Sequence, residues 1–390
     1  MRIYIHNFFV FISILWIMAG LWLLPDGLKL LSGISIVFLL FTLLTNKTTI
    51  LLNRIKQNKI IILSLFFTLI VIITKELYGG IYGSFMRSCI IFSVLFICIY
   101  SQNTTKRSLY IPILLGILLN SSYLIYTTII KDIYRPVEIM NPNLYAPLFG
   151  IFLILSFNFV DFKKPTLLSV VSLISSLLLT FSVVVMQSRG VLAASLFALL
   201  ALSFNTILIN KSKLKTIGIL LSIVFISIYF NQEKIDILYK KSMTEYGRIS
   251  NGDLNSSVGL RIQMLTVGMS MIKEAPLFGH GKDYKEIKTK TVEKKSLNKV
   301  INTFSTLHNV YIDSWAKLGI LGFLMTILLT LLPYLLLKGS SYWVLGLSLS
   351  SFTFIISMVD TVLLGGSFLL AIITICLILK YQPLNKENLI

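Results

Sequence analysis

Charged side chains are scarce in this sequence, and long polar stretches are scarcer still. Only 13% of the 390 residues are Asp, Glu, Lys or Arg, whereas 56% are hydrophobic, and the mean hydropathy is +0.85. Apolar runs of 16 to 22 residues recur from one end of the chain to the other, and a helix needs about 20 residues to cross the hydrocarbon core of a bilayer. The composition therefore predicts an all-helical, polytopic protein of the inner-membrane type, with no separate soluble domain.

Cysteine and the sequence motifs of metal and nucleotide sites are also rare or missing. The three cysteines, Cys89, Cys98 and Cys376, all fall inside predicted spans, so a disulfide framework or a thiolate metal site is not expected. No D-x-D pair, P-loop or G-x-G-x-x-G is present, and no Cys or His cluster has zinc spacing. We expect no metal and no other cofactor, and a metal-held nucleotide-sugar site is disfavoured.

The apolar runs predict twelve membrane-spanning helices, with one long gap between the ninth and the tenth. The expected division is residues 1–230 with nine spans, residues 231–318 as one large polar loop, and residues 319–390 with three spans. The first run follows a single arginine and has no small-residue cleavage site, so we expect it to be retained as a span. The spans are placed near residues 8–24, 27–45, 59–74, 85–100, 109–130, 143–160, 166–186, 190–209, 215–230, 319–337, 342–359 and 361–379.

Basic residues predict the orientation of these spans. With the N-terminus in the cytoplasm, the short loops on that side hold fifteen Lys or Arg and those on the other side hold six. The positive-inside rule favours this arrangement, which places the long loop on the outside, the periplasm of a bacterium. The net charge of +19 then reflects membrane anchoring more than nucleic-acid binding. The loop holds fourteen Lys or Arg against nine Asp or Glu, a balance that suits an anionic lipid or a diphosphate.

Two stretches of the long loop have recognisable patterns. In GLRIQMLTVGMSMIKEAPLFGHG, apolar residues at helical spacing predict an amphipathic helix from about Leu260 to Lys273, ended by Pro276 and Gly279. We expect this helix to lie along the membrane interface. The following lysine-rich stretch, KDYKEIKTKTVEKKSLNK, is expected to be a solvated or mobile lid.

Two arginines are candidates for binding phosphate. Arg189 lies in a hinge between two spans with almost no loop to place it in water, and a cation near a bilayer centre costs roughly 2.5–3.5 kcal/mol. It is either a snorkelling interfacial arginine or a fixed guanidinium whose fork binds phosphate oxygens. Arg261 opens the amphipathic helix. It is either a solvated surface residue or part of an anion site, because a bound anion would gain from both the arginine and the helix N-terminus.

Histidine is rare as well, and one of the three histidines stands at a helix start. His308 precedes Asn309 and the apolar run of the tenth span. Because histidine accepts a proton near neutral pH, His308 is a candidate general base for a sugar hydroxyl, although a structural role is the alternative. Asp360 falls between the last two predicted spans, and a single carboxylate there makes a poor proton relay.

Three local patterns together resemble the O-antigen ligase family, within the wider superfamily of these ligases and the Wzy-type polymerases. They are QSRG at the hinge, GLRIQM followed by the PLFGHG turn, and LHNVYIDSWAKLGILGF at the end of the large loop. The recognisable motifs cover about fifty residues, whereas the resemblance in layout covers nearly the whole chain, with twelve spans and one large periplasmic loop before the last three.

The resemblance implies a metal-independent, inverting glycosyltransferase of the C type in lipopolysaccharide biosynthesis. Arg189 and Arg261 would bind the diphosphate of undecaprenyl-diphosphate-linked O-antigen, and His308 would deprotonate the acceptor hydroxyl of lipid A-core oligosaccharide. Arg248, Arg135 and the lysines between residues 282 and 299 remain candidates for contacting core phosphates. A Wzy-type polymerase is the nearest alternative, and the single large loop favours a ligase. A flippase is disfavoured because the spans are nearly uncharged.

Overall fold

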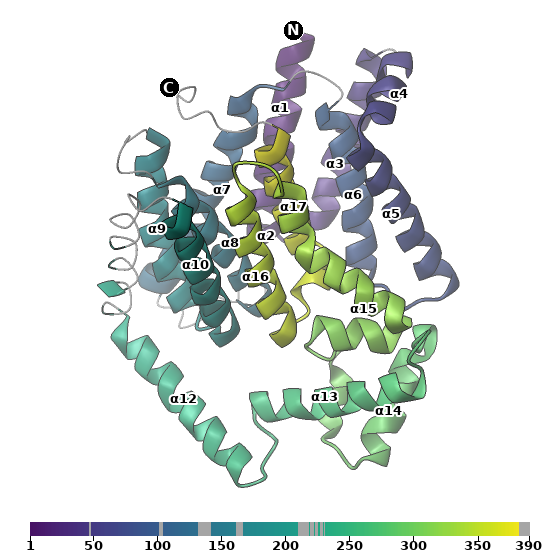
Figure 1. Cartoon of the computed structure of the whole chain (residues 1–390), viewed down its shortest axis with the longest axis vertical. Helices are drawn as coiled ribbons and strands as arrows, with labels where there is room; N and C mark the ends of the chain where they lie inside the picture. The colour runs from purple at the N-terminus through teal and green to yellow at the C-terminus, as the bar shows by residue number, and fades with distance from the viewer. Residues whose placement is uncertain are drawn as a thin grey trace.

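Helices make up every regular element that the structure describes. The computed structural model describes residues 1–46, 48–100, 104–131, 142–160, 167–209 and 231–381, together with residues 218, 222, 225, 226 and 229. Most helices form one bundle, and a smaller group lies beyond one end of it (Figure 1).

The bundle contains the apolar helices of both halves of the chain, together with the more polar α4. In chain order they are α1 (Arg2–Leu15), η1 (Trp16–Gly20), α2 (Leu21–Leu23), α3 (Gly27–Thr45), α4 (Thr48–Gln57), α5 (Lys59–Leu77), α6 (Gly83–Tyr100), α7 (Lys106–Ile125), η2 (Tyr126–Ile130), α8 (Pro142–Phe159), α9 (Leu167–Val185), α10 (Arg189–Ile209), α15 (Val310–Leu337), α16 (Trp343–Val359), η6 (Val362–Gly365) and α17 (Ser367–Tyr381). The smaller group is α12 (Gln232–Ser250), α13 (Ser257–Glu274), η4 (Gly281–Asp283), α14 (Tyr284–Lys294) and η5 (Lys299–Thr303).

Six of these helices are long and apolar enough to cross a membrane, and five shorter apolar helices accompany them. On α5, Leu65, Phe66 and Leu69 are exposed, an arrangement that suits contact with lipid better than contact with water. The chain is therefore a polytopic membrane protein. The predicted span 215–230 lies outside the described residues apart from single positions, as do Lys47, Lys163, Lys164, Lys211, Lys213, Lys215, Arg135 and Lys386 of the orientation argument. The count of twelve and the orientation remain predictions.

The smaller group forms a lobe with an apolar core of its own. Met264, Val267 and Met271 of α13 pack with Tyr284 and Val292 of α14. The predicted helix from Leu260 to Lys273 is therefore confirmed as part of α13. Its apolar stripe, however, faces the inside of the lobe rather than lipid, and a position of the helix along the membrane interface stays a prediction. The periodicity showed which face is apolar, but not what covers it.

Two of the polar segments between or beyond the spans form helices. α4 occupies most of residues 46–58, the segment predicted to be a cytoplasmic loop between two spans. The lysine-rich stretch, expected to be a solvated or mobile lid, forms η4 and α14. Most of its lysines are exposed, but Lys288 is only 2% exposed and is therefore not solvated. An analysis of apolar runs does not detect polar helices of this kind.

α15 enters the bundle through a kink. The predicted span began at residue 319, whereas the helix begins at Val310 and bends at Gly319, where φ is 67° and ψ is −158°. A Cβ at Gly319 would collide with the carbonyl of Leu277, so only glycine fits there. The first part of α15 thus belongs to the lobe, and the apolar part after the kink belongs to the bundle.

Candidate functional site

His308 lies two residues before the start of α15, at the end of the bundle that faces the lobe. Its backbone is left-handed, with φ of 50°, a conformation that few residues other than glycine adopt and that is common at functional sites. The next residue, Asn309, caps α15 by accepting a hydrogen bond from the Ile312 N–H at 3.0 Å. The Asn309 amide also donates to the carbonyl of Met358 at 3.0 Å. These contacts tie the start of α15 to the end of α16.

The imidazole of His308 is paired with Asp360, the residue directly after α16. His308 Nδ1 lies 3.3 Å from Asp360 Oδ1, and the same oxygen accepts a hydrogen bond from the Thr361 N–H at 2.7 Å. The histidine side chain is 23% exposed and the aspartate side chain 8%. A carboxylate on Nδ1 selects the tautomer in which Nε2 carries no proton. No hydrogen bond to Nε2 is found within the described residues, so that nitrogen is available to accept a proton.

Arg189 is the first residue of α10, after a tight turn at the end of α9. Its guanidinium donates to Ser242 Oγ at 3.2 Å through Nη1 and to Glu245 Oε2 at 2.8 Å through Nη2. Both partners lie on α12. The arginine side chain is 32% exposed and that of Glu245 is 9% exposed. The fork of Arg189 therefore already holds a carboxylate, the kind of anion that a phosphate group would replace.

Arg189 and His308 lie at the same end of the bundle, although they do not touch. A Cβ at Gly190 would come within 2.7 Å of Val359 Cγ2, so the start of α10 packs against the last turn of α16. Val359 is followed by Asp360, the partner of His308. The end of α16 thus connects the two sites: Val359 packs against the start of α10, where Arg189 lies, and the next residue, Asp360, pairs with His308.

Arg261 is farther along the lobe. It is partly exposed on α13, and no hydrogen bond or ion pair joins it to another described residue. Gly268, seven residues later and hence on the same helix face, packs directly against Ile312 and Leu307. That face of α13 therefore points toward the segment that carries His308, and Arg261 lies about 10 Å along the helix from the contact. The structure does not bring Arg261 into contact with His308 or Arg189.

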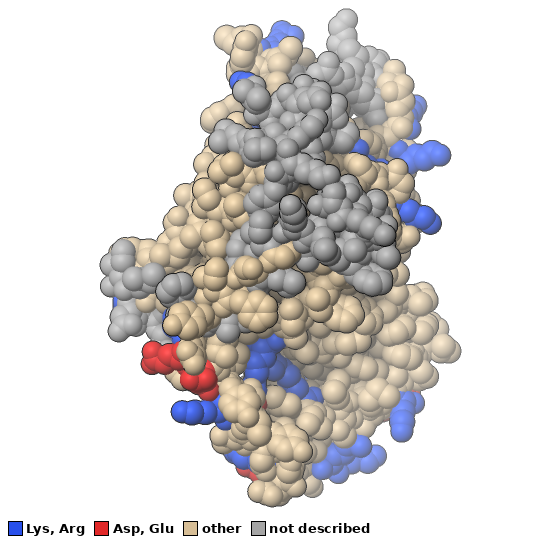
Figure 2. Space-filling model, turned by 60° about the vertical axis from the view of Figure 1, so that its left-hand side comes forward, with Lys and Arg blue, Asp and Glu red and all other residues tan. Residues whose placement is uncertain are grey.

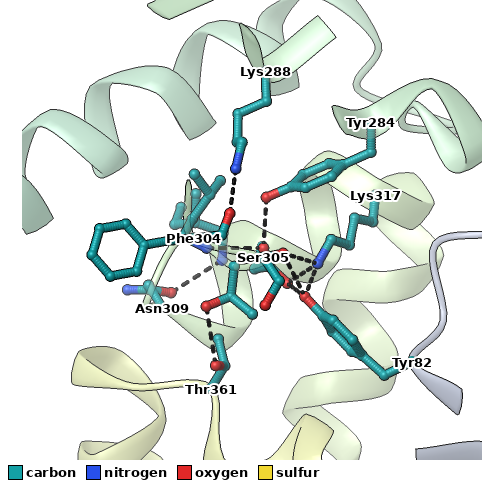
Figure 3. A network of polar contacts seen from close by, with 12 residues as sticks. Tyr82, Tyr284, Lys288, Phe304, Ser305, Asn309, Lys317 and Thr361 are labelled. Carbon is teal, nitrogen blue, oxygen red and sulfur yellow. Dashed lines mark hydrogen bonds and ion pairs between the residues drawn. The ribbon is translucent and has the colours of Figure 1, made fainter. Parts of the chain in front are cut away.

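A buried polar network holds the loop that precedes His308 (Figure 3). At its centre, Asp313 is fully buried and Lys317 is 4% exposed, with Lys317 Nζ 2.6 Å from Asp313 Oδ2. Asp313 Oδ1 accepts from the Leu307 N–H at 3.1 Å and from the Tyr284 hydroxyl at 2.8 Å. Burial, with the nearby Asp313 charge, raises the pKa of Tyr284 well above its usual value, so the phenol stays a donor. Two buried charges are tolerated because each is paired and hydrogen-bonded.

The same network reaches the bundle and the rest of the loop. The Tyr82 hydroxyl, from the segment before α6, donates to Asp313 Oδ2 and to the Ser305 carbonyl, both at 3.1 Å, and it also contacts the Lys317 ammonium. Lys288 of α14 donates to the carbonyls of Ile301, at 3.3 Å, and Phe304. The backbone immediately before His308 is thus fixed from both the bundle and the lobe.

Sequence reasoning missed the partners of the predicted residues. Asp360 was set aside as an isolated carboxylate, whereas the structure pairs it with His308. Its position between two apolar runs was the available signal. Asp313 and Lys317 stand four residues apart in a mostly apolar helix, a spacing that also indicates an ion pair. Glu245 had no such signal. Of the other candidates, Arg248 pairs with Asp253 at 2.7 Å, and Arg135 lies outside the described residues.

No metal-binding group stands out near this site. Within the described residues, no three His, Cys, Asp or Glu side chains come together as metal ligands would.

The end of the bundle that faces the lobe carries both cationic and acidic groups. Figure 2 shows lysine and arginine side chains in a hollow on the face where α12 comes forward, with acidic side chains at its edge. The arrangement can bind an anion and can accept a proton.

The fold and this site define a polytopic membrane protein with a His–Asp pair and an arginine at one end of its helices. Residues 174–327 match the sequence model of the family described as O-antigen ligase, so the chain carries a domain of that family over this range. The matched range includes Arg189, Arg261 and His308. Members of the family are enzymes that transfer glycans, and their substrates are lipid-linked glycans.

A curated protein of Haemophilus influenzae, named only as an uncharacterized protein, is also similar. It is 36% identical over 130 residues. The aligned region covers 32% of this chain and 32% of that protein, so the chain spans about a third of the length of the relative that it matches. This similarity adds no activity or substrate of its own.

Proposed function

We propose that this protein is an O-antigen ligase, a metal-independent, inverting glycosyltransferase of the C type. It transfers O-antigen polysaccharide from undecaprenyl diphosphate to lipid A-core oligosaccharide at the periplasmic face of the inner membrane. In this proposal residues 1–230 and 319–390 form twelve spans and residues 231–318 form the periplasmic loop. The observation that carries the proposal is the His308–Asp360 pair, at 3.3 Å, on the helix end against which the Arg189 segment packs.

His308 acts as the general base. Asp360 holds Nδ1–H, and Nε2 takes the proton of an acceptor hydroxyl as the hydroxyl oxygen attacks the anomeric carbon of the donor. The bond from that carbon to the diphosphate oxygen breaks on the opposite face of the sugar, so the configuration is inverted. The leaving diphosphate keeps the electron pair, and the proton stays on His308 until it passes to water or to the leaving group.

Arg189 and Arg261 stabilise the negative charge that develops on the leaving diphosphate. Arg189 does so by exchanging its pair with Glu245 for phosphate oxygens, which its planar fork can bind through two hydrogen bonds. Arg261 has no anion partner among the described residues, and it faces the same side of the lobe as the His308 segment. The arginines supply the positive charge, so the proposal requires no metal ion.

The test is lipopolysaccharide gel profiling in a strain that lacks this gene. We expect bare lipid A-core together with polymerised O-antigen on undecaprenyl diphosphate, restored to the normal ladder by the wild-type gene. His308→Ala and Arg189→Lys are expected not to restore it at equal expression. His280→Ala is the matched control and should restore it, because that histidine contacts the Met271 carbonyl at 3.0 Å and lies outside the proposed site. Core capped with a single repeat unit in the deletion strain would instead identify a polymerase, and the proposed acceptor would be wrong.

A further inference from the structure

The turn that follows α13 exposes two large apolar side chains. In the sequence Pro276-Leu277-Phe278-Gly279, Leu277 is 62% exposed and Phe278 is 73% exposed. Adjacent bulky apolar residues are rarely this open in water unless they have a partner. The proposed reaction makes no use of this turn, so its exposed side chains need another explanation.

All four carbonyls of the same turn accept hydrogen bonds from the protein, that of Leu277 from the Ile320 N–H at 3.3 Å. The carbonyl of Pro276 accepts from Trp315 Nε1 at 2.9 Å and from the Ile320 N–H at 3.1 Å. The carbonyls of Phe278 and Gly279 accept from the Tyr78 hydroxyl at 2.6 and 2.8 Å. Because lipid offers no hydrogen bonds, carbonyls that are already bonded within the protein lower the cost of placing this turn and its outward apolar side chains at the edge of the bilayer.

The turn also lies level with the ends of two apolar helices. Tyr78 directly follows α5, and Ile320 is the first residue of α15 after its kink. Beside these contacts, Leu77 is 77% exposed and Leu321 is 70% exposed. The open side chains of the turn therefore continue the exposed apolar faces with which α5 and α15 meet the bilayer.

We propose that the turn Pro276–Gly279 inserts Leu277 and Phe278 into the leaflet of the bilayer next to the lobe. The occupant of this surface is lipid, the same bilayer that α5 and α15 cross. Trp315 and Tyr78 beside the turn are residue types enriched at the boundary between hydrocarbon and headgroups. Lys273 and Lys282, both exposed and on either side of the turn in sequence, are placed to meet anionic headgroups.

The insertion fixes the height of the lobe above the membrane. The turn is joined directly to α13, and through Trp315 and Ile320 to α15. Because α13 carries Arg261 and α15 follows His308, both are held at one distance from the bilayer surface. The inference stands independently of the proposed reaction, since it concerns only which medium surrounds two side chains.

Spin-label accessibility in nanodiscs that hold one copy of the full chain tests the insertion. A label is placed at Phe278→Cys and, separately, at Leu277→Cys, while the native cysteines Cys89, Cys98 and Cys376 are buried. Leu69→Cys, on the exposed face of α5, is the lipid reference. Lys290→Cys, at a side chain that is 66% exposed on α14, is the water reference. The unsubstituted chain gives the labelling background.

We expect both turn labels to match the lipid reference, with a ratio of oxygen to nickel-chelate accessibility several-fold above that of the Lys290→Cys label. A ratio equal to that of the water reference would overturn the proposal. Low accessibility to both reagents would overturn it as well, because protein would then cover the turn. With one copy in each disc, that cover would have to come from the chain itself.

Discussion

Replacing Glu245 by glutamine is expected to tighten binding of the diphosphate donor. In the structure Glu245 occupies the fork of Arg189 at 2.8 Å and is mostly buried. If Arg189 binds the donor diphosphate, the carboxylate competes with the substrate for the same guanidinium. Glutamine is similar in size and can still accept a hydrogen bond, but it has no charge to hold the arginine. The competition therefore weakens while the fold of α12 is retained.

The size of the effect follows from the loss of one ion pair. Glutamine still accepts a hydrogen bond from the guanidinium, so only the attraction between the two opposite charges is lost. Arg189 is 32% exposed, and an ion pair screened by solvent contributes about 0.2–1 kcal/mol. Since about 1.4 kcal/mol corresponds to a tenfold change in affinity, we expect the dissociation constant to fall by up to about fivefold.

Binding of undecaprenyl diphosphate to the purified chain in nanodiscs measures this effect. Glu233→Gln is the matched control, because it makes the same charge change on the same helix at an exposed position in the first turn of α12. Its dissociation constant should stay near the wild-type value. Weaker binding by Glu245→Gln would refute the reasoning, since Glu245 would then serve to orient Arg189. Equal strengthening by both variants would also refute it, because general charge would be the cause.

Three further changes test the site and its support. Asp360→Asn should lower kcat by about 10²- to 10⁴-fold with little change in KM, measured in steady-state transfer assays; a proportional rise in KM would contradict the base-orienting role. Asp313→Asn leaves the Lys317 ammonium buried without its partner, so it should destabilise the fold by about 3–5 kcal/mol, and adding Lys317→Met should recover part of this in thermal unfolding; no recovery would contradict the pairing. Lys288→Met should lower the free energy of unfolding by about 1–3 kcal/mol. Lys290→Met, at an exposed position of the same helix, should leave it unchanged. Burial lowers the pKa of Lys288 below 10.5 in the folded state. Just below pH 10.5 the unfolded state therefore binds more protons than the folded state, so the stability of the wild type should rise with pH in that range. The stability of the Lys288→Met variant should not show this rise.

The six long apolar helices of the described residues were predictable, because each contains an apolar run of about the length that crosses a bilayer. Most of α13 was also predictable, since the stripe of apolar residues and the proline that follows the helix are local signals. The helix begins at Ser257, three residues before the predicted start, and ends at Glu274. The orientation of the apolar stripe was not predictable. Whether Met264 and Val267 face lipid or protein depends on α14, a polar helix that the sequence analysis had assigned to a solvated segment.

The site was predictable in its candidates but not in its contacts. Arg189 and His308 stood out because charged or titratable groups beside membrane spans need a reason. Their partners could not be assigned, because Asp360 is 52 residues from His308 and Glu245 is 56 residues from Arg189. Such pairs form only through the packing of α10, α12 and α16. The roles assigned to Arg189, Arg261 and His308 remain predictions.

Reconstituted glycan transfer tests the central claim most directly. The purified chain in liposomes is given undecaprenyl-diphosphate-linked O-antigen with either lipid A-core or a second lipid-linked repeat as acceptor. The account predicts glycan-modified lipid A-core with inverted linkage for the wild type, and loss of that product for His308→Ala while donor binding is kept. Elongation of the lipid-linked repeat without modification of lipid A-core, or an undiminished rate for His308→Ala, would contradict it.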